Sequence, residues 1–417
     1  MVRLSATERA MAQGAQGDAR ALAIRVVAEA ARLMGADALL EISSAHIDGC
    51  LYHGESGVEF AERLIQGGAR VAVPATLNVG VLNLCRPGQV KTDARLQDFG
   101  ERLARAYQAM GCLPTWTCSP YQAGHRPGLG HHVAWGESNA VVFCNSVLGA
   151  RTNRYGDFLD ICCALTARAP AVGLHLDGPR RATIVIECQA LSPRLRANEA
   201  FYPVLGAWLG AEVGAEVAVL DGLPADLAED RLKALGAAAA STGAVGLFHV
   251  AGVTPEAPTV RAALKNQEPE RVIRLTPGML WPARDRLSTA GTDAIDCVAL
   301  GSPHFSLAEF DRLEAALPKD PFQVPVYACT GRHVVDRLEA QGRTARLAEA
   351  GVEIVADTCV VVAPILPAGG GVLMTNSAKF AHYAPGTIGY DVVFGSLEDC
   401  LASAVAGRVR RDETPWQ

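Results

Sequence analysis

The sequence of 417 residues predicts an α/β protein with largely parallel sheets. Short apolar segments of strand length alternate with longer segments whose apolar residues recur at helical spacing. Several apolar segments end in glycine, proline or cysteine, which is typical of strands whose carboxyl ends carry ligand-binding loops. A chain of this length exceeds one ordinary hydrophobic core, so we expect more than one lobe.

The first half alternates helices and strands. Apolar side chains recur at helical spacing from residue 18 to residue 34 and stop at Gly35, which predicts a helix. We expect further helices at 57–67 and 93–110. Strands are expected at 36–43, 70–75 and 113–117. This alternation favours parallel pairing of the strands.

The second half of the chain differs in composition and in the order of its expected elements. ATIVIEC (182–188) predicts a strand, and the alanine- and leucine-rich stretch 200–240 predicts two helices. Five strand-to-turn units complete the pattern: 243–252, 271–277, 294–302, 324–331 and 351–359. We therefore expect three lobes, at 1–190, at 191–285 as a helix-rich α/β lobe, and at 286–417 as a further α/β lobe.

Composition excludes several classes of protein. The formal net charge of -6 leaves no basic face for nucleic acid. No apolar run reaches the roughly 18 residues that a membrane span requires. The start, MVRLSATERAMAQG, has no apolar signal region. We expect a cytoplasmic protein that acts on a small molecule and has neither a nucleic-acid nor a membrane partner.

The chain contains twelve cysteines. A disulfide framework is not expected, because the chain is large enough to build a core and does not look secreted. Taken singly, each cysteine is typical of core packing. Because no CxxC pair occurs, any metal site must be assembled from loops that are distant in the sequence.

Three cysteines stand out by their surroundings. Cys118 lies in Thr-Cys-Ser-Pro-Tyr, an exposed polar setting that suits a metal better than a core. Cys359 follows an aspartate and a threonine, and either begins a buried strand or acts as a ligand at its rim. Cys297 lies within AIDCVAL, where core packing is the simpler interpretation.

Three polar residues have equally open interpretations. Glu137 and Ser138 either supply an acid–base carboxylate or cap a helix that continues into Asn139. Lys379, near Asn376 and Ser377, binds a substrate carboxylate or is a surface lysine.

Six segments in order resemble the catalytic chain of aconitase X, a divergent branch of the aconitase superfamily. The resemblance extends from the first helix to about Gly386. It implies an aconitase-like multi-lobed fold that lacks the swivelling domain. In such a fold, 1–190 would be a catalytic lobe with substrate loops, and 286–417 would contribute a cluster ligand and Lys379. The segments are IDGCLYHG (47–54), VPATLNVG (73–80), TCSPYQAG (117–124), WGESNAVVFCNSVLGARTNR (135–154), GSPHFS (301–306) and TNSAKFAHYAPG (375–386).

The resemblance implies an iron–sulfur cluster held by three cysteines, with one iron position open for substrate. It places two ligands at Cys118 and Cys359. The third family ligand lies in a Gly-Cys-Pro-His turn, which here reads GSPH (301–304), so either Cys297 or Ser302 takes its place. We favour Cys297 because thiolate is the usual ligand of such clusters. The choice among 2Fe–2S, 3Fe–4S and 4Fe–4S stays open.

The resemblance also implies the substrate contacts and the reaction. These contacts are Gly49, Cys50, Leu51, Asn78, Val79, Glu137, Ser138 and Lys379. Family members dehydrate cis-3-hydroxy-L-proline or mevalonate 5-phosphate. Since few cationic groups lie in these loops to bind a phosphate dianion, we expect cis-3-hydroxy-L-proline, with 1-pyrroline-2-carboxylate as the product. Iron would act as a Lewis acid on the 3-hydroxyl.

A partner chain is expected as well. In two-chain members, resemblance assigns the general base to a serine of a small subunit that carries the swivelling domain. The present chain has no room for that domain, so we expect a small partner that completes the active site. Three alternatives stay open. The chain could be a dehydratase subunit for mevalonate 5-phosphate or another small hydroxy acid, a cluster-free binding or scaffolding subunit, because of Ser302, or a thiol hydrolase that uses Cys118 with His125 or His304.

Overall fold

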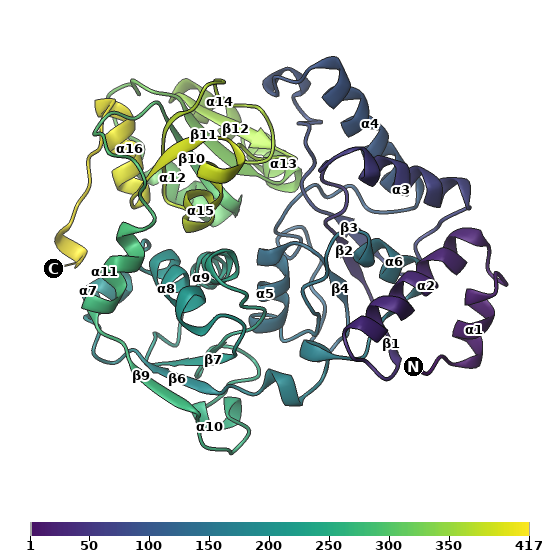
Figure 1. Ribbon diagram of the computed structural model, residues 1–417. Helices are drawn as coiled ribbons and strands as arrows, with labels where there is room; N and C mark the ends of the chain where they lie inside the picture. Colours follow the sequence, from purple (N-terminus) through teal and green to yellow (C-terminus); the bar gives the residue numbers. More distant parts are fainter. Residues whose placement is uncertain (1, 417) are drawn as a thin grey trace. The chain divides into compact units, whose positions relative to one another are not determined.

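The protein, represented by a computed structural model that describes residues 2–416, divides into two compact units (Figure 1). The first unit comprises the residues up to Leu82 together with Thr92–Arg181. The second comprises Asn83–Lys91 and the chain from Ala182 onward. Each unit has its own sheets and helices and is described separately.

The first unit contains a parallel sheet in the order β3-β2-β4. Its strands are β2 (Ala45–Ile47), β3 (Ala75–Leu77) and β4 (Ala134–Trp135). Ala45 is in register with both Ala75 and Ala134, so the three strands end at the same edge. An antiparallel pair, β1 (Leu39–Glu41) and β5 (Arg168–Pro170), lies apart from this sheet.

Four helices of the first unit bury apolar side chains in one core with these strands. Val27, Leu64, Leu103 and Ile161, from four helices, belong to it. The helices are α1 (Ala6–Ala12), α2 (Asp18–Leu33), α3 (Glu55–Gln66), α4 (Ala94–Ala109), α5 (Ser138–Ser146) and α6 (Leu159–Thr166).

The second unit has two parallel sheets. One has the order β8-β7-β6-β9, and the other has the order β12-β11-β10-β13-β14. The strands are β6 (Ile184–Glu187), β7 (Ala218–Asp221), β8 (His249–Val250), β9 (Arg271–Arg274), β10 (Cys297–Phe305), β11 (Val326–Thr330), β12 (Val352–Ala356), β13 (Gly371–Thr375) and β14 (Tyr390–Phe394). The prediction of an α/β fold with largely parallel sheets is confirmed.

Helices α8 and α9 pack very closely (Figure 1). Gly206 makes this possible, because a Cβ there would lie 2.2 Å from the Leu235 carbonyl oxygen of the facing helix. The helices of this unit are α7 (Pro193–Ala197), α8 (Phe201–Val213), α9 (Glu229–Thr242), α10 (Val260–Ala263), α11 (Pro277–Asp285), α12 (Leu307–Ala315), α13 (Arg332–Ala340), α14 (Arg343–Glu349), α15 (Ala378–Thr387) and α16 (Leu397–Ala406).

Several local expectations need correction. The strand expected at 70–75 is β3 at Ala75–Leu77, and 113–117 forms only an isolated bridge between Leu113 and Thr76. Strand β7 interrupts the stretch that was expected to hold only two helices. The lobe boundaries near 190 and 285 stay predictions. Among residues 2–416, no helix is both long and apolar enough to cross a bilayer.

Candidate active site

Three loops with sequence-predicted substrate residues leave the same edge of the β3-β2-β4 sheet. Asp48 and Gly49 follow β2, Asn78 follows β3, and Glu137 follows β4 after one glycine. The parallel register brings these loops together, as expected for ligand-binding loops of an open α/β sheet.

Asp160 of α6 anchors the loop after β2. Its Oδ2 atom accepts hydrogen bonds from the backbone N–H groups of Asp48, at 2.6 Å, and Gly49, at 3.2 Å. Its Oδ1 atom accepts from the Ile161 N–H at 2.6 Å. Burial raises the pKa of Asp160 to about 7, although these three hydrogen bonds act to lower it. Sequence reasoning missed this residue.

Gly49 is required at its position by close packing. A Cβ there would lie 2.8 Å from the Tyr107 hydroxyl oxygen. The next residue, Cys50, is buried, and its thiol lies 3.3 Å from the carbonyl oxygens of Ile47 and Asn78. Burial raises the pKa of Cys50 well above its ordinary value, so the protonated thiol donates to these carbonyls and links the two loops.

Asn78 connects the loop after β3 to Asp48. Its backbone N–H donates to the Ile47 carbonyl at 2.9 Å, and its Nδ2 atom donates to Asp48 Oδ1. The pKa of Asp48 is raised to about 7 by burial first and then by Glu137, Asp157 and Asp160. Asp48 was not among the sequence-predicted residues, although it lies within the motif that contains Gly49.

The structure favours the capping interpretation of Glu137. This residue has a φ of 61° and is the N-cap of α5. Its Oε2 atom accepts from the Ala140 N–H at 2.7 Å, and the Ser138 hydroxyl lies 3.4 Å from its Oε1 atom. An acid–base role for Glu137 and Ser138 stays a prediction.

Cys118 is less exposed than its polar neighbours suggested, with an exposure of 8%. Its carbonyl oxygen accepts from Asn139 Nδ2 at 2.9 Å, which ties the turn to α5. Tyr121, in the same turn, stacks on Phe143 of α5 with ring centroids 3.5 Å apart. The expectation of an exposed setting was therefore wrong, because α5 packs against this turn.

In the second unit, the segment from Gly301 to His304 forms a bulge in β10. Leu300 is level with Ala328 of β11 and Phe305 with Thr330, so five steps along β10 span the same length as two steps along β11. Gly301 has a φ of 87°, and a Cβ there would lie 2.1 Å from the Cys329 carbonyl oxygen. Ser302 lies in this bulge, and its carbonyl accepts from the Ser377 hydroxyl.

Cys359 follows β12 and lies in a turn held by ionic and hydrogen-bond contacts. Asp357 is buried and forms a bidentate pair with Arg332, with N–O distances of 2.8 and 2.7 Å. Cys85 donates its thiol hydrogen to Asp357 Oδ2 at 3.3 Å. Cys359 itself is 8% exposed.

A histidine links the Ser302 bulge to the Cys359 turn. His304 Nε2 donates to the Thr358 carbonyl oxygen at 3.1 Å. Burial lowers the pKa of His304 to about 3, so the ring is neutral. Ser302 and Cys359 therefore lie on segments that meet at the carboxyl edge of one sheet.

Cys297 lies at the opposite edge of this sheet. It begins β10. The next residue, Val298, is level with Val326 of β11, which is in turn level with Val352 of β12. Ala356, at the carboxyl end of β12, therefore lies five positions beyond the level of Cys297, about 16 Å at roughly 3.3 Å per residue. Cys297 is therefore too far from the Cys359 turn to share one cluster with it. The strand register therefore favours Ser302 over Cys297 as the third ligand, and the identity of that ligand stays a prediction.

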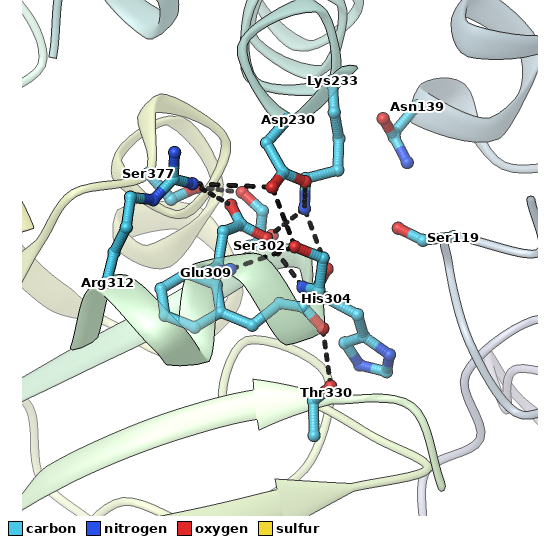
Figure 2. A network of polar contacts seen from close by, with 12 residues as sticks. Ser119, Asn139, Asp230, Lys233, Ser302, His304, Glu309, Arg312, Thr330 and Ser377 are labelled. Carbon is cyan, nitrogen blue, oxygen red and sulfur yellow. Dashed lines mark hydrogen bonds and ion pairs between the residues drawn. The ribbon is translucent and has the colours of Figure 1, made fainter. Parts of the chain in front are cut away.

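A buried ionic network lies behind the bulge (Figure 2). Lys233 pairs with Glu309 and with Asp230, the latter at 3.1 Å, and donates to the His304 carbonyl at 3.2 Å. A cavity of about 70 Å³ borders this network and is lined by Lys233, Ser302, Ser377 and Lys379 among other residues. Two predicted site residues, Ser302 and Lys379, therefore share one cavity.

The donor set for a cluster is distributed over both units. Cys118 belongs to the first unit, and Cys359 and Ser302 belong to the second. Within residues 2–416, no three histidine, cysteine or acidic side chains form a group that could hold a metal ion. Within the second unit, the Cys359 thiol and the Ser302 hydroxyl lie on segments that His304 links.

Comparisons with known proteins identify the family. Family models described as the aconitase X first, second and third domains match residues 1–178, 182–284 and 295–406. The crystal structure of aconitase X (holo-form) from Thermococcus kodakaraensis superposes with a TM-score of 0.86 and 31% identity, covering 97% of this chain and 100% of that one.

Curated relatives agree with these matches. Two proteins named cis-3-hydroxy-L-proline dehydratase, from Pseudomonas aeruginosa and Hypocrea jecorina, are 44% and 40% identical, covering 99% and 97% of this chain and 72% and 69% of their own lengths. A phosphomevalonate dehydratase large subunit from Methanothermobacter thermautotrophicus is 37% identical, covering 94% of this chain and 96% of its own. This chain belongs to the aconitase X family.

Proposed function

We propose that this chain is the large subunit of a hydro-lyase that removes water from cis-3-hydroxy-L-proline to give 1-pyrroline-2-carboxylate. The observation that carries the proposal is similarity over nearly the whole chain to two proteins of that name, which exceeds the similarity to the phosphomevalonate dehydratase subunit. The carboxylates around Asp48 add support, because they disfavour a phosphate ester at this edge of the sheet.

The cofactor that we propose is an iron–sulfur cluster held by Cys118, Cys359 and the bulge that contains Ser302. When bound, the cluster would supply Lewis acidity toward the substrate hydroxyl. Cys359 and Ser302 suit this role because His304 joins their segments through the Thr358 carbonyl.

The remaining side chains would bind and orient the substrate. We assign Lys379 to the substrate carboxylate, because a cation there stabilises the charge that develops as the neighbouring carbon loses its proton. Ser138 begins α5, and a helix N-terminus favours negative charge in the same way. Loss of water then gives an enamine, which tautomerises to 1-pyrroline-2-carboxylate.

A small subunit with a swivelling domain is proposed as the partner that supplies the general base. The hydroxyproline dehydratases extend well beyond the region that this chain matches, whereas the matched phosphomevalonate dehydratase chain is itself named a large subunit. The proposed location is the cytoplasm. The twelve cysteines, all within residues 2–416, are thiols in the structure, which suits a reducing compartment.

The substrate is tested with the chain and its small subunit after anaerobic reconstitution. Both cis-3-hydroxy-L-proline and mevalonate 5-phosphate are supplied at equal concentration, and loss of each is followed. Turnover of the hydroxyproline supports the proposal. Turnover of the phosphate alone contradicts it.

The cluster is tested by iron and sulfide analysis of the same preparation. Iron and sulfide in the wild type, and their loss in Cys359→Ala, are expected. A colourless wild-type protein without iron after reconstitution would indicate a cluster-free binding or scaffolding subunit. A Cys359→Ala variant that keeps full activity would point instead to a thiol hydrolase.

A further inference from the structure

Asp48 occupies the centre of the substrate-loop edge in the first unit. It follows β2, the middle strand of the sheet, with Asn78 after one neighbouring strand and Gly136 after the other. A Cβ on Gly136 would lie 2.7 Å from the Asp48 Cβ atom, so glycine is needed there for the close approach. Asp48 is half-buried, whereas Asp160 beneath it is fully buried.

Next to Asp48 is a second hydrogen-bond acceptor. Asn78 is 2% exposed, and its Nδ2 atom donates to Asp48 Oδ1. The other end of this amide, Oδ1, has no hydrogen-bond partner among the described residues. A buried amide oxygen without a donor is unfavourable, so a ligand that brings a donor would stabilise it.

The electrostatic surroundings of Asp48 indicate the charge of that ligand. Three further carboxylates act on it: Glu137, Asp157 and Asp160. Burial and these groups raise its pKa to about 7, while Asn78 acts to lower it. An ionised carboxylate in such a position is stabilised by a cation, and an incoming anion is repelled.

We infer that Asp48 and Asn78 Oδ1 bind the secondary ammonium group of a cyclic amino acid substrate and thereby determine specificity. The inference rests on the proposed function and deepens it. The ring nitrogen of cis-3-hydroxy-L-proline carries two N–H donors and one positive charge. These match one carboxylate and one amide oxygen, so the ammonium group satisfies both acceptors. A hydroxy acid without nitrogen leaves Asn78 Oδ1 without a donor and the Asp48 carboxylate without a cation.

The main test compares Asp48→Asn with Asp37→Asn in the iron-loaded chain with its small subunit. Loss of a charge-assisted hydrogen bond predicts an increase in KM for cis-3-hydroxy-L-proline of about 10- to 100-fold for Asp48→Asn, with little change in kcat. Asp37 is exposed and is not among the carboxylates that act on Asp48, so removing the same charge there is expected to change KM by less than about threefold. Iron content and the melting temperature verify that Asp48→Asn folds and keeps its cluster.

A second arm uses cis-2-hydroxycyclopentane-1-carboxylate, which replaces the ring nitrogen by carbon, as a competitive inhibitor. The wild type should bind the amino acid far more tightly than this analogue, and Asp48→Asn should reduce that preference by the same factor as its increase in KM. If Asp48→Asn lost affinity equally for both compounds, or left KM unchanged, the proposed ammonium site would be wrong while the proposed function would still stand. Absence of hydroxyproline turnover by the wild type would reject the proposed function and the ammonium site together.

Discussion

Replacement of Lys233 by methionine tests how the second unit supports the Ser302 bulge. Lys233 is 2% exposed, and its ammonium group contacts Asp230, Glu309 and the His304 carbonyl. Burial lowers the pKa of Lys233, but Glu309 and Asp230 raise it by more, so the ammonium group stays charged.

The expected loss of unfolding free energy is about 3–5 kcal/mol, the usual cost of removing one partner from a buried ion pair. Methionine keeps the apolar volume of the stem but leaves two carboxylates near each other without their shared cation. Arg312, whose Nη2 atom lies 3.6 Å from Asp230 and 3.9 Å from Glu309, still offsets part of this repulsion. We therefore expect a value near the lower limit.

Urea unfolding followed by far-UV circular dichroism measures the loss, with exposed Lys319→Met as the matched control. The double variant Lys233→Met/Glu309→Gln also removes one of the two carboxylates that then repel each other, so it should recover part of the lost unfolding free energy. A loss below about 1 kcal/mol for Lys233→Met would refute the reasoning, since it would mean that the network is not stabilised by charge pairing. Reduced iron retention in Lys233→Met is expected as well, because His304 loses a contact that holds it.

Three further predictions concern the site. Cys297→Ala should keep the iron content per chain, whereas Ser302→Ala should lower it; elemental analysis that finds the reverse would restore Cys297 as the ligand. Asp160→Asn should raise KM for the hydroxyproline more than about tenfold, because the loop after β2 loses a carboxylate that accepts two of its N–H groups; steady-state kinetics that find no change would show that this anchor is dispensable. Because the pKa of Asp48 in the fold is about 7, above its ordinary value of 3.8, ionisation destabilises the substrate-free protein as pH rises toward 7. Asp48→Asn should therefore melt at a higher temperature than the wild type at pH 8 and show a smaller difference at pH 4, and a lower melting temperature at pH 8 would contradict this.

Local patterns in the sequence were enough to predict much of the fold. The helix expected at 18–34 is α2 at Asp18–Leu33, because its apolar spacing and the glycine after it act within a few residues. Strand β7 and the position of β3 were missed. Strands of three or four residues form by pairing with neighbours, and so short a segment carries little periodic signal of its own.

The residues of the candidate site were likewise predicted only in part. The motifs by themselves determined the aconitase X resemblance and the residues around Gly49, Asn78 and Glu137. They gave no sign that Asp160, 112 residues from Asp48, accepts hydrogen bonds from the β2 loop, or that Lys233 pairs with Glu309, 76 residues away. Such pairs are decided by which helices pack against which loops.

The choice of the third cluster ligand shows most directly why tertiary structure was needed. In the sequence, Cys297 and Ser302 are five residues apart, and the chemistry of iron–sulfur clusters favoured the thiol. In the folded sheet, one begins β10 and the other lies in its bulge at the opposite edge, beside the segment that contains Cys359. Residue type was determined by the sequence, but the distance between candidate ligands was set by strand register, which only the tertiary structure decides.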